Sequence, residues 1–454
     1  MRKENDLGND NITALLFKLA IPSMIAQFVN VLYSIVDRIF ISNIPLIGDL
    51  ALAGVGVAAP IITIITSFCY LVALGGAPLL AIRLGEKRPE LAQKIMSNCF
   101  TALLAVSFLI TGICLLIKEP MLMLFGASEN TFLYANEYLT IYLLGTVFAM
   151  LSLGLNSFIT CQGFSKVAMF SILIGAATNI VLDPIFIFAL DMNVRGAAIA
   201  TVIAQFVSFA FAVHFLMGKR SYVKLSFKGL SFKIMKKIMT LGFSPFCIMA
   251  TEGVIIVALN TALQNFGGTL ADYYVAGGTI VVCFMQLITI PLGGLTMGAQ
   301  PLMSYNFGAK NFDRIKKAFK GLLLMCLTFN VIMFIFAQTV PQLFVAIFTN
   351  SATTAAIAIR GIKIYTLGTI FLTTQYACVD TLTALGSAKY AIFLSMLRKV
   401  GILLTLTIVL PMLFGVEATF FAEPVADILG GIISIIVFSL SIGKIFKERE
   451  KTCD

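Results

Sequence analysis

The chain has 454 residues, of which 59% are hydrophobic and 12% charged, and its formal net charge is +10. Soluble domains carry about 25% charged residues, so a chain with so few charges cannot cover a water-facing surface. The composition excludes a soluble protein. It predicts an all-α polytopic membrane protein, because each transmembrane helix needs roughly 20 mostly apolar residues.

Long apolar runs predict twelve transmembrane helices joined by short loops. The first run is too long for the core of a signal peptide and is followed by no small-residue cleavage site, so we expect it to stay as a helix. The predicted spans cover residues 14–42, 51–82, 93–117, 137–160, 167–190, 195–217, 238–265, 273–303, 318–341, 361–385, 389–413 and 418–443.

Lysine and arginine gather in the loops on one side of the predicted membrane. The opposite loops hold only Lys118, Arg195, Arg360 and Lys363. By the positive-inside rule, both termini are expected in the cytoplasm. The same distribution accounts for the positive net charge without a nucleic-acid partner, because the basic residues form no stripe interleaved with aromatic residues.

Polar side chains inside the first span share one helical face. Ser23, Gln27, Asn30, Tyr33 and Asp37 follow each other at intervals of 4, 3, 3 and 4 residues, which places them on one side of a helix. An ionisable group inside a span is costly unless it faces the protein interior or a water-filled cavity. Asp37 is therefore a functional candidate.

The fifth span carries a second acidic residue. Asn179 and Asp183 are four residues apart, and Pro184 follows directly. Because proline removes a backbone hydrogen bond, we expect a kink that leaves a carbonyl free near these side chains. A carboxylate, an amide and a free carbonyl suit a hard cation or a proton. Thr201 on the next span adds a hydroxyl.

The second half has its own polar residues. Glu252 lies in the middle of the seventh span, and a polar stripe on the tenth span contains Thr369, Thr373, Tyr376, Asp380 and Thr383. In the last two spans, Glu423 and Asp427 are predicted to pair with Arg398 and Lys399 in a structural role, since both charge signs are present on adjacent helices.

An internal repeat relates the two halves. An offset of 223 residues maps Pro22 onto Pro245, Pro78 onto Pro301, and the segment 163–166 (Gly-Phe-Ser-Lys) onto 386–389 (Gly-Ser-Ala-Lys). Each half has six predicted spans, so the two copies have the same orientation and are related by an axis along the membrane normal. We predict an amino-terminal lobe at residues 1–218, a basic cytoplasmic linker at 219–237 and a carboxyl-terminal lobe at 238–454. Substrate would bind between the lobes.

No enzyme signature is visible, neither a zinc-protease HExxH nor a nucleotide-binding P-loop. The nine cysteines have no metal-site spacing, and the single His214 cannot build a zinc site. We therefore expect no enzyme activity and no cofactor, and we expect a secondary transporter driven by an ion gradient. The alternatives are a membrane transferase, which would need an acidic or histidine motif in a loop, and an ion channel, for which a duplicated, kinked design is unnecessary.

Several segments resemble the multidrug and toxic compound extrusion (MATE) family, most closely its MepA-like bacterial branch. They are residues 33–41, 179–188 and 191–198, together with the paired loops 163–166 and 386–389. The resemblance covers nearly the whole chain, and the run Asn-Ile-Val-Leu-Asp-Pro at 179–184 is its most specific part.

The resemblance implies two lobes that alternate between inward-open and outward-open states. It implies export of cationic or amphipathic drugs in exchange for H⁺ or Na⁺ across a bacterial plasma membrane. An amino-lobe ion site would then lie at Asp37, Asn179, Asp183 and Thr201, and a carboxyl-lobe Na⁺ site at Glu252, Tyr376 and Asp380.

We expect the chain to act as a monomer in the lipid bilayer and to bind small molecules. The predicted substrate cavity is lined by Gln27, Asn30, Tyr33, Asn156, Gln205 and Gln286. A lipid or lipid-linked-sugar flippase of the same wider superfamily is the alternative within transport. The acidic stripes oppose that alternative, since a flippase cavity would be strongly cationic.

Overall fold

The structure is a computed structural model that describes residues 6–127, 129–225, 229–349 and 351–451. Residues 226–228 of the predicted linker lie outside these ranges. Within them the regular secondary structure is entirely helical. In chain order the helices are α1 (Ile12–Ser42), α2 (Gly48–Gly85), α3 (Pro89–Leu124), α4 (Glu129–Cys161), α5 (Ser165–Pro184), η1 (Ile185–Ala189), α6 (Asn193–Met217), α7 (Phe232–Phe266), η2 (Gly268–Leu270), α8 (Ala271–Gly308), α9 (Phe312–Thr339), α10 (Pro341–Val345), α11 (Ala352–Tyr365), α12 (Thr369–Ala384), α13 (Ala388–Met396), η3 (Leu397–Leu404), α14 (Thr405–Phe414), η4 (Val416–Phe421) and α15 (Ala422–Lys451).

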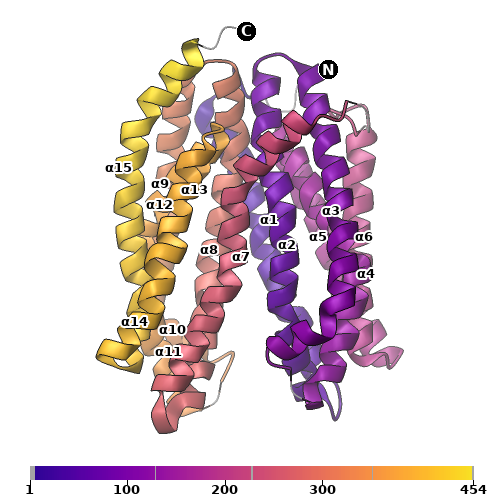
Figure 1. The fold of residues 1–454 in the computed structure, drawn as a ribbon, viewed down its shortest axis with the longest axis vertical. Helices are drawn as coiled ribbons and strands as arrows, with labels where there is room; N and C mark the ends of the chain where they lie inside the picture. The colour runs from indigo at the N-terminus through magenta and orange to yellow at the C-terminus, as the bar shows by residue number, and fades with distance from the viewer. Residues whose placement is uncertain (1–5, 128, 226–228, 350, 452–454) are drawn as a thin grey trace.

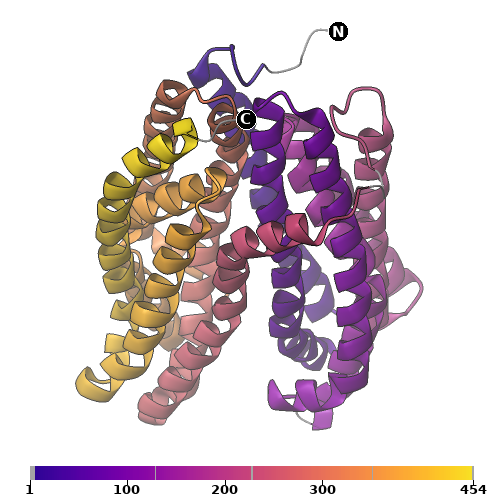
Figure 2. The same ribbon diagram turned by 45° about the horizontal axis from the view of Figure 1, so that its top comes forward.

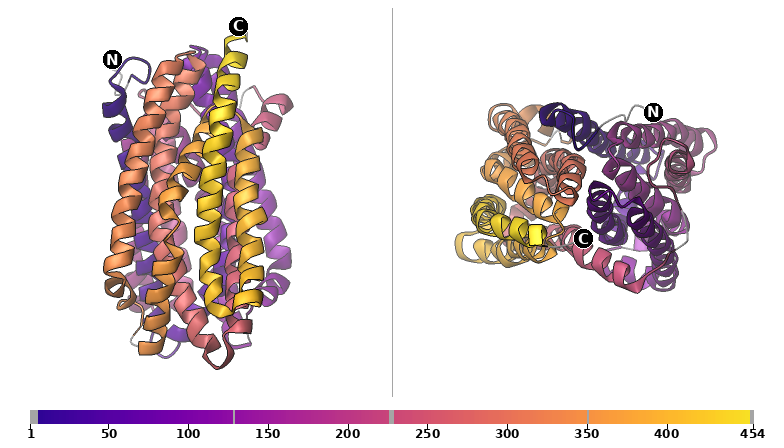
Figure 3. Two further views of the ribbon diagram at one scale, coloured as in Figure 1. Left: turned by 90° about the vertical axis from the view of Figure 1, so that its left-hand side faces the viewer. Right: turned by 90° about the horizontal axis from the view of Figure 1, so that it is seen from above.

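The predicted all-α membrane architecture is confirmed. Among the described residues, 11 helical segments are long and apolar enough to cross a membrane, and the number is 12 when the bent pair α11 and α12 counts as one span. Helices α1 to α6 lie on one side of the molecule and α7 to α15 on the other (Figure 1). Seen along the helices, the two groups lie side by side (Figure 3).

The tenth predicted span, residues 361–385, is not one continuous helix. Helices α11 and α12 meet at an angle of 53°. Gly368 lies in this break and packs against α15, where an added Cβ would come within 2.7 Å of the Pro424 Cα atom. The local sequence Thr-Leu-Gly-Thr favours a break, because glycine lowers helix propensity, and the close contact with α15 leaves no room for a side chain there.

Two spans contain a segment of π-helix, which has a wider turn than the α-helix. After Pro184, α5 continues as the π-helix η1, so the expected simple kink is a change of helix type. The predicted span 389–413 contains the π-helix η3, which carries Arg398 and Lys399. Such segments are rare and often occur at functional sites.

Helix α1 begins and α15 ends at the same end of the molecule (Figure 1). We call this the terminal end. There the two halves are in close contact, because α1 packs along α8 and α2 packs along α7. The first turns of α7 cross from one half to the other (Figure 2). Toward the opposite end the ribbons of the two halves diverge (Figure 1).

A symmetric pair of glycines lies at the crossing of α2 and α8. An added Cβ on Gly85 would lie 1.8 Å from the Tyr305 carbonyl oxygen, and one on Gly308 would lie 1.9 Å from the Ile82 carbonyl oxygen. The 223-residue offset maps Gly85 onto Gly308 and Ile82 onto Tyr305. Each copy of the repeat thus makes the same contact with the other, as a two-fold relation between the halves requires.

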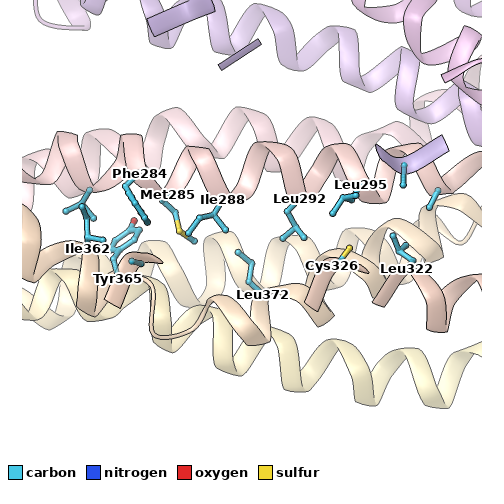
Figure 4. Close-up of a cluster of buried hydrophobic side chains, with 14 of the residues drawn as sticks. Phe284, Met285, Ile288, Leu292, Leu295, Leu322, Cys326, Ile362, Tyr365 and Leu372 are labelled. Atoms are coloured by element: carbon cyan, nitrogen blue, oxygen red, sulfur yellow. The ribbon is translucent and has the colours of Figure 1, made fainter. Parts of the chain in front are cut away.

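The apolar cores also cross the boundary between the halves at the terminal end. Side chains of α8, α9, α11 and α12 form one large buried cluster (Figure 4), and Leu15, Leu16 and Leu19 of α1 belong to it. Conversely, Ile238 of α7 belongs to the cluster formed by α2, α3 and α4. The start of each half is therefore packed into the core of the other.

Candidate functional site

Two acidic side chains from distant parts of the sequence meet inside the first half. Asp37 of α1 and Asp183 of α5 are both buried, and their carboxyl groups are within hydrogen-bonding reach of each other. Asp37 Oδ1 and Asp183 Oδ2 accept no hydrogen bond from the described residues. Two ionised carboxylates cannot satisfy each other because neither has a proton to donate. The pair therefore needs a shared proton or a cation.

Asn179 completes this acid pair from one helical turn away. Its Nδ2 donates to Asp183 Oδ1 at 3.0 Å, which fixes the orientation of the amide. Asn179 Oδ1 is then left buried and without a donor among the described residues. Three oxygen acceptors thus lack a donor at one place, which is the donor set expected for a proton or a small hard cation.

A set of hydroxyl groups surrounds the acid pair. Tyr33 of α1 lies close to both acids, and Tyr138 of α4 lies close to Asp37 and in hydrogen-bonding contact with Thr201. Thr201 therefore joins the site through Tyr138. Tyr33 was predicted for the substrate cavity, but here it lies beside the acids. The neighbouring Arg38 is exposed, and its charge acts on both Asp37 and Cys283 of α8.

The sequence analysis missed Tyr138 and Tyr142 on α4. The Tyr142 hydroxyl faces Thr66 and Gln205, so Gln205 lies beside these tyrosines and is absent from the cavity lining described next. A signal for both tyrosines exists in the sequence. They are four residues apart and therefore share one face of the helix.

A cavity lies between α1, α2, α4, α5 and α8, nearer the terminal end than the acid pair. It encloses about 660 Å³ of empty space, part of which is open to solvent. Gln27 and Asn156, two of the residues proposed for a substrate cavity, line it, and Asn30 lies at its edge, where its Nδ2 donates to Gln27 Oε1 at 3.2 Å. Gln286 on α8 is partly buried and is not among the lining residues.

The lining of this cavity is apolar with a few uncharged polar groups. Met169, Met297 and Pro301 contribute apolar surface, and Gln300 a further amide. Asn156 Oδ1 is buried without a hydrogen-bond donor from the described residues. An apolar pocket with a few acceptors is the usual form of a small-molecule site. Gln300 and Met297 were not among the predicted cavity residues, although Gln286 on the same helix was.

The carboxyl-lobe candidates lie around a second, smaller cavity. Tyr376 and Asp380 of α12 line it, together with Arg398 and Lys399 of η3. Glu252 of α7 does not line this cavity, but its Oε2 accepts a hydrogen bond of 2.5 Å from Lys399 Nζ.

The predicted pairing of Arg398 and Lys399 is correct in part. Arg398 binds both Glu423, at 2.8 Å, and Asp427, at 2.5 Å. Lys399, in contrast, makes its ion pair with Glu252. The two basic residues are consecutive in the chain, yet they form ion pairs with acidic residues of different helices.

An ion pair closes the terminal end between the halves. Arg449 of α15 donates to the Glu86 carboxylate at the end of α2, and to the carbonyl oxygen of Gly308 at 3.1 Å. Arg83 binds the same carboxylate from within α2. Because these side chains are largely buried, this ion pair is expected to stabilise the contact between the halves next to the glycine crossing.

Comparison with known proteins places this architecture in a family. The MatE family profile matches residues 22–185 and 249–409. The multidrug export protein MepA of Staphylococcus saprophyticus is 23% identical over 424 residues, which cover 93% of this chain and 92% of that protein. MepA of Staphylococcus haemolyticus is 23% identical over 95% of this chain and 94% of its own length.

Solved structures agree along almost the whole chain. An outward-facing MATE transporter superposes with a TM-score of 0.90 at 21% identity, covering 98% of this chain and 99% of that one. The MATE multidrug transporter DinF-BH, solved as a complex with a small molecule, has a TM-score of 0.88 at 30% identity over 98% of this chain and 99% of its own. These relatives are transporters and not enzymes. The chain therefore belongs to the MATE family of multidrug efflux transporters.

Proposed function

We propose that this protein is a secondary antiporter that exports cationic or amphipathic drugs in exchange for H⁺ or Na⁺. The observation that carries the proposal is the Asp37–Asp183 pair, whose carboxyl groups lie together in the interior with oxygen atoms that lack donors among the described residues. A buried pair of acids binds a positive charge strongly when the site is closed to water. Binding and release of that charge is the event that an ion gradient can drive.

The drug would bind in the larger cavity, where uncharged acceptors and apolar side chains meet. Asn156 Oδ1 and Gln27 are the groups that would accept hydrogen bonds from a cationic drug. DinF-BH, to which this chain is 30% identical, is known in complex with a small molecule. Part of the cavity is open to solvent, so a drug can reach these groups.

Helix α1 connects the drug cavity with the acid pair. Gln27 lines the cavity and Asp37 belongs to the pair, and ten residues of helix separate them by about 15 Å. A movement of α1 that accompanies binding at one site therefore changes the geometry of the other site. Coupling of this kind is reciprocal: if the ion weakens drug binding by a given factor, the drug weakens ion binding by the same factor.

The closed terminal end supports alternating access. The excess of Lys and Arg in the loops supports a cytoplasmic position for this end, and the staphylococcal relatives support a bacterial plasma membrane as the location. The seam there consists of the Gly85–Gly308 crossing and the Arg449–Glu86 ion pair, both of which must separate before the cavity opens to the cytoplasm. In Figure 1 the ribbons of the two halves diverge toward the opposite end, which is the arrangement expected of a state closed at the terminal end.

The test is transport in vesicles by the purified protein. A pH gradient and a Na⁺ gradient are imposed separately while ethidium movement is followed by fluorescence. The proposal expects one of the two gradients to drive ethidium transport and Asp183→Asn to abolish it while the variant remains folded. Equal transport by the variant and the parent would refute the role of Asp183.

A further inference from the structure

The smaller cavity in the second half has an unusual set of charges on its walls. Arg398 and Lys399 contribute two positive charges to it, and Asp380 contributes the one carboxylate among its lining residues. Tyr376, Gln375 and Ser395 complete its polar lining. The family resemblance would place a Na⁺ ion among Glu252, Tyr376 and Asp380, so the donor set has to be compared with what Na⁺ requires.

The carboxylates around this cavity are already engaged. Arg398 neutralises Glu423 and Asp427 through contacts of 2.8 and 2.5 Å. Lys399 Nζ donates to Glu252 Oε2 at 2.5 Å. Asp380 is in hydrogen-bonding contact with the Thr296 hydroxyl. Each of these carboxylates therefore already has a partner within the chain, and Asp427 Oδ2 is the oxygen atom among them that lies buried without a donor from the described residues.

The ammonium group of Lys399 is chemically suited to the place of a small cation. It is compact, carries one positive charge and has three hydrogen-bond donors on a flexible stem. A Na⁺ ion entering beside it would face the charges of both Lys399 and Arg398 at short range, and like charges repel. The residues present do not fit a Na⁺ ion.

The backbone supports this placement of two consecutive cations. In a regular α-helix neighbouring residues point about 100° apart. Arg398 and Lys399 nevertheless line the same cavity, and the segment that carries them is the π-helix Leu397–Leu404. Both cations lie on this π-segment, and π-segments within α-helices occur frequently at functional sites.

We propose that Lys399 is a tethered cation that occupies the carboxyl-lobe cation position and excludes Na⁺ from Glu252, Tyr376 and Asp380. The ion selectivity of the second half is thus set by one lysine. A consequence, which rests on the proposed transport function, is that the coupling ion exchanges only at Asp37 and Asp183. The exclusion of Na⁺ itself depends on the carboxyl-lobe geometry alone.

The experiment measures binding of radioactive Na⁺ to the purified full-length protein in detergent at neutral pH. In this experiment the parent is the double variant Asp37→Asn with Asp183→Asn, and not the unmodified protein. The two substitutions remove the acids of the first half. We expect no saturable binding to this parent. Adding Lys399→Met frees Glu252 and should raise bound Na⁺ at least tenfold, to about one ion per protein, and a further Asp380→Asn should remove the gain.

Two matched variants control for the loss of a positive charge. Lys399→Arg keeps the charge in the cavity and should show no gain in Na⁺ binding. Lys444→Met makes the same change at an exposed position of α15 and should also show no gain. Lys399→Gln is a second test of the freed site, and all variants are compared as monodisperse protein.

The proposal is overturned if the parent already binds Na⁺ saturably and Asp380→Asn or Glu252→Gln removes that binding. It is also overturned if monodisperse Lys399→Met and Lys399→Gln bind no more Na⁺ than the parent. Neither measurement involves drug transport, so failure of the proposed export function would be detected separately, in the vesicle assay.

Discussion

Gly85 and Gly308 are equivalent residues of the internal repeat, and each packs against the helix that carries the other. Gly85 faces the Tyr305 carbonyl of α8, and Gly308 faces the Ile82 carbonyl of α2. The two helices approach so closely because neither glycine has a side chain. This crossing holds the halves together at the terminal end, and in the proposed transport cycle it must form and separate once per turnover.

A larger residue at the crossing should prevent the terminal end from closing. Gly308→Leu would force α2 and α8 apart, because even its Cβ would lie 1.9 Å from a backbone oxygen. We expect ethidium efflux to fall at least tenfold, measured in vesicles with matched amounts of protein. Gly443→Leu is the control, since an added Cβ there meets nothing within 4 Å. Efflux by Gly308→Leu at the level of the control would contradict this role of the crossing.

The ion pair above this crossing should bias the protein toward the closed terminal end. Replacing Arg449 by Gln removes the charge-assisted hydrogen bond to Glu86, and hydrogen bonds to charged groups are worth about 1.5–3 kcal/mol. We expect a cysteine placed at Ser165, in the cavity lining, to react at least several-fold faster with a reagent applied from the terminal side. The comparison uses a background without the native cysteines.

A charge reversal tests whether the pair itself is responsible. The double variant Glu86→Arg with Arg449→Glu should restore slow labelling in part, although Arg83 also contacts Glu86. Labelling as fast in the double variant as in Arg449→Gln would show that the pair does not hold the terminal end closed.

Arg398 should be the most important single charge for folding in the second half. Arg398→Met would leave Glu423 and Asp427 buried without a cation. Removing one partner of a buried ion pair costs about 3–5 kcal/mol. We expect a clear drop in the melting temperature in detergent, and partial recovery when Glu423→Gln and Asp427→Asn are added.

An exposed ion pair provides the matched control. Arg360 binds Glu417 at 2.6 Å, with side chains 65% and 47% exposed. Exposed pairs contribute about 0–1 kcal/mol, so Arg360→Met should leave the melting temperature almost unchanged. Equal drops for Arg398→Met and Arg360→Met would refute the structural importance assigned to Arg398.

Much of the amino-lobe site follows from sequence periodicity. Asn179 and Asp183 are one helical turn apart, and their hydrogen bond is the contact that such spacing favours. Asp37 was a candidate because a carboxylate inside a span needs a polar environment. The meeting of Asp37 with Asp183 was not predictable from residues alone, because it depends on how α1 packs against α5.

The carboxyl-lobe site shows where sequence patterns stop being informative. Because the last two spans are adjacent in the chain, we expected both Arg398 and Lys399 to form ion pairs with acids of α15. Lys399 instead forms its ion pair with Glu252 on α7. The π-helix that carries these two residues cannot be recognised from the pattern of apolar residues in the sequence. The break before α12 was also not predicted, although Gly368 lies in it and glycine lowers helix propensity.

The drug cavity should respond to the loss of a single acceptor. Asn156→Leu removes a buried oxygen that has no donor among the described residues. If that oxygen binds the drug, a lost hydrogen bond to a charged ligand corresponds to about 1.5 kcal/mol or more, so the apparent KM for ethidium should rise about tenfold. Asn43→Leu, at an exposed position beyond α1, is the control. An unchanged KM in Asn156→Leu would place the drug elsewhere.

The central claim is that the Asp37–Asp183 pair binds the ion whose gradient drives export. The most direct measurement is ethidium transport in vesicles by the parent, Asp37→Asn and Asp183→Asn under a pH gradient or a Na⁺ gradient, each protein shown to be folded by its melting temperature. The account predicts that one gradient drives transport by the parent and that neither gradient drives it in either variant. Gradient-driven transport at the parental rate by both variants would contradict it.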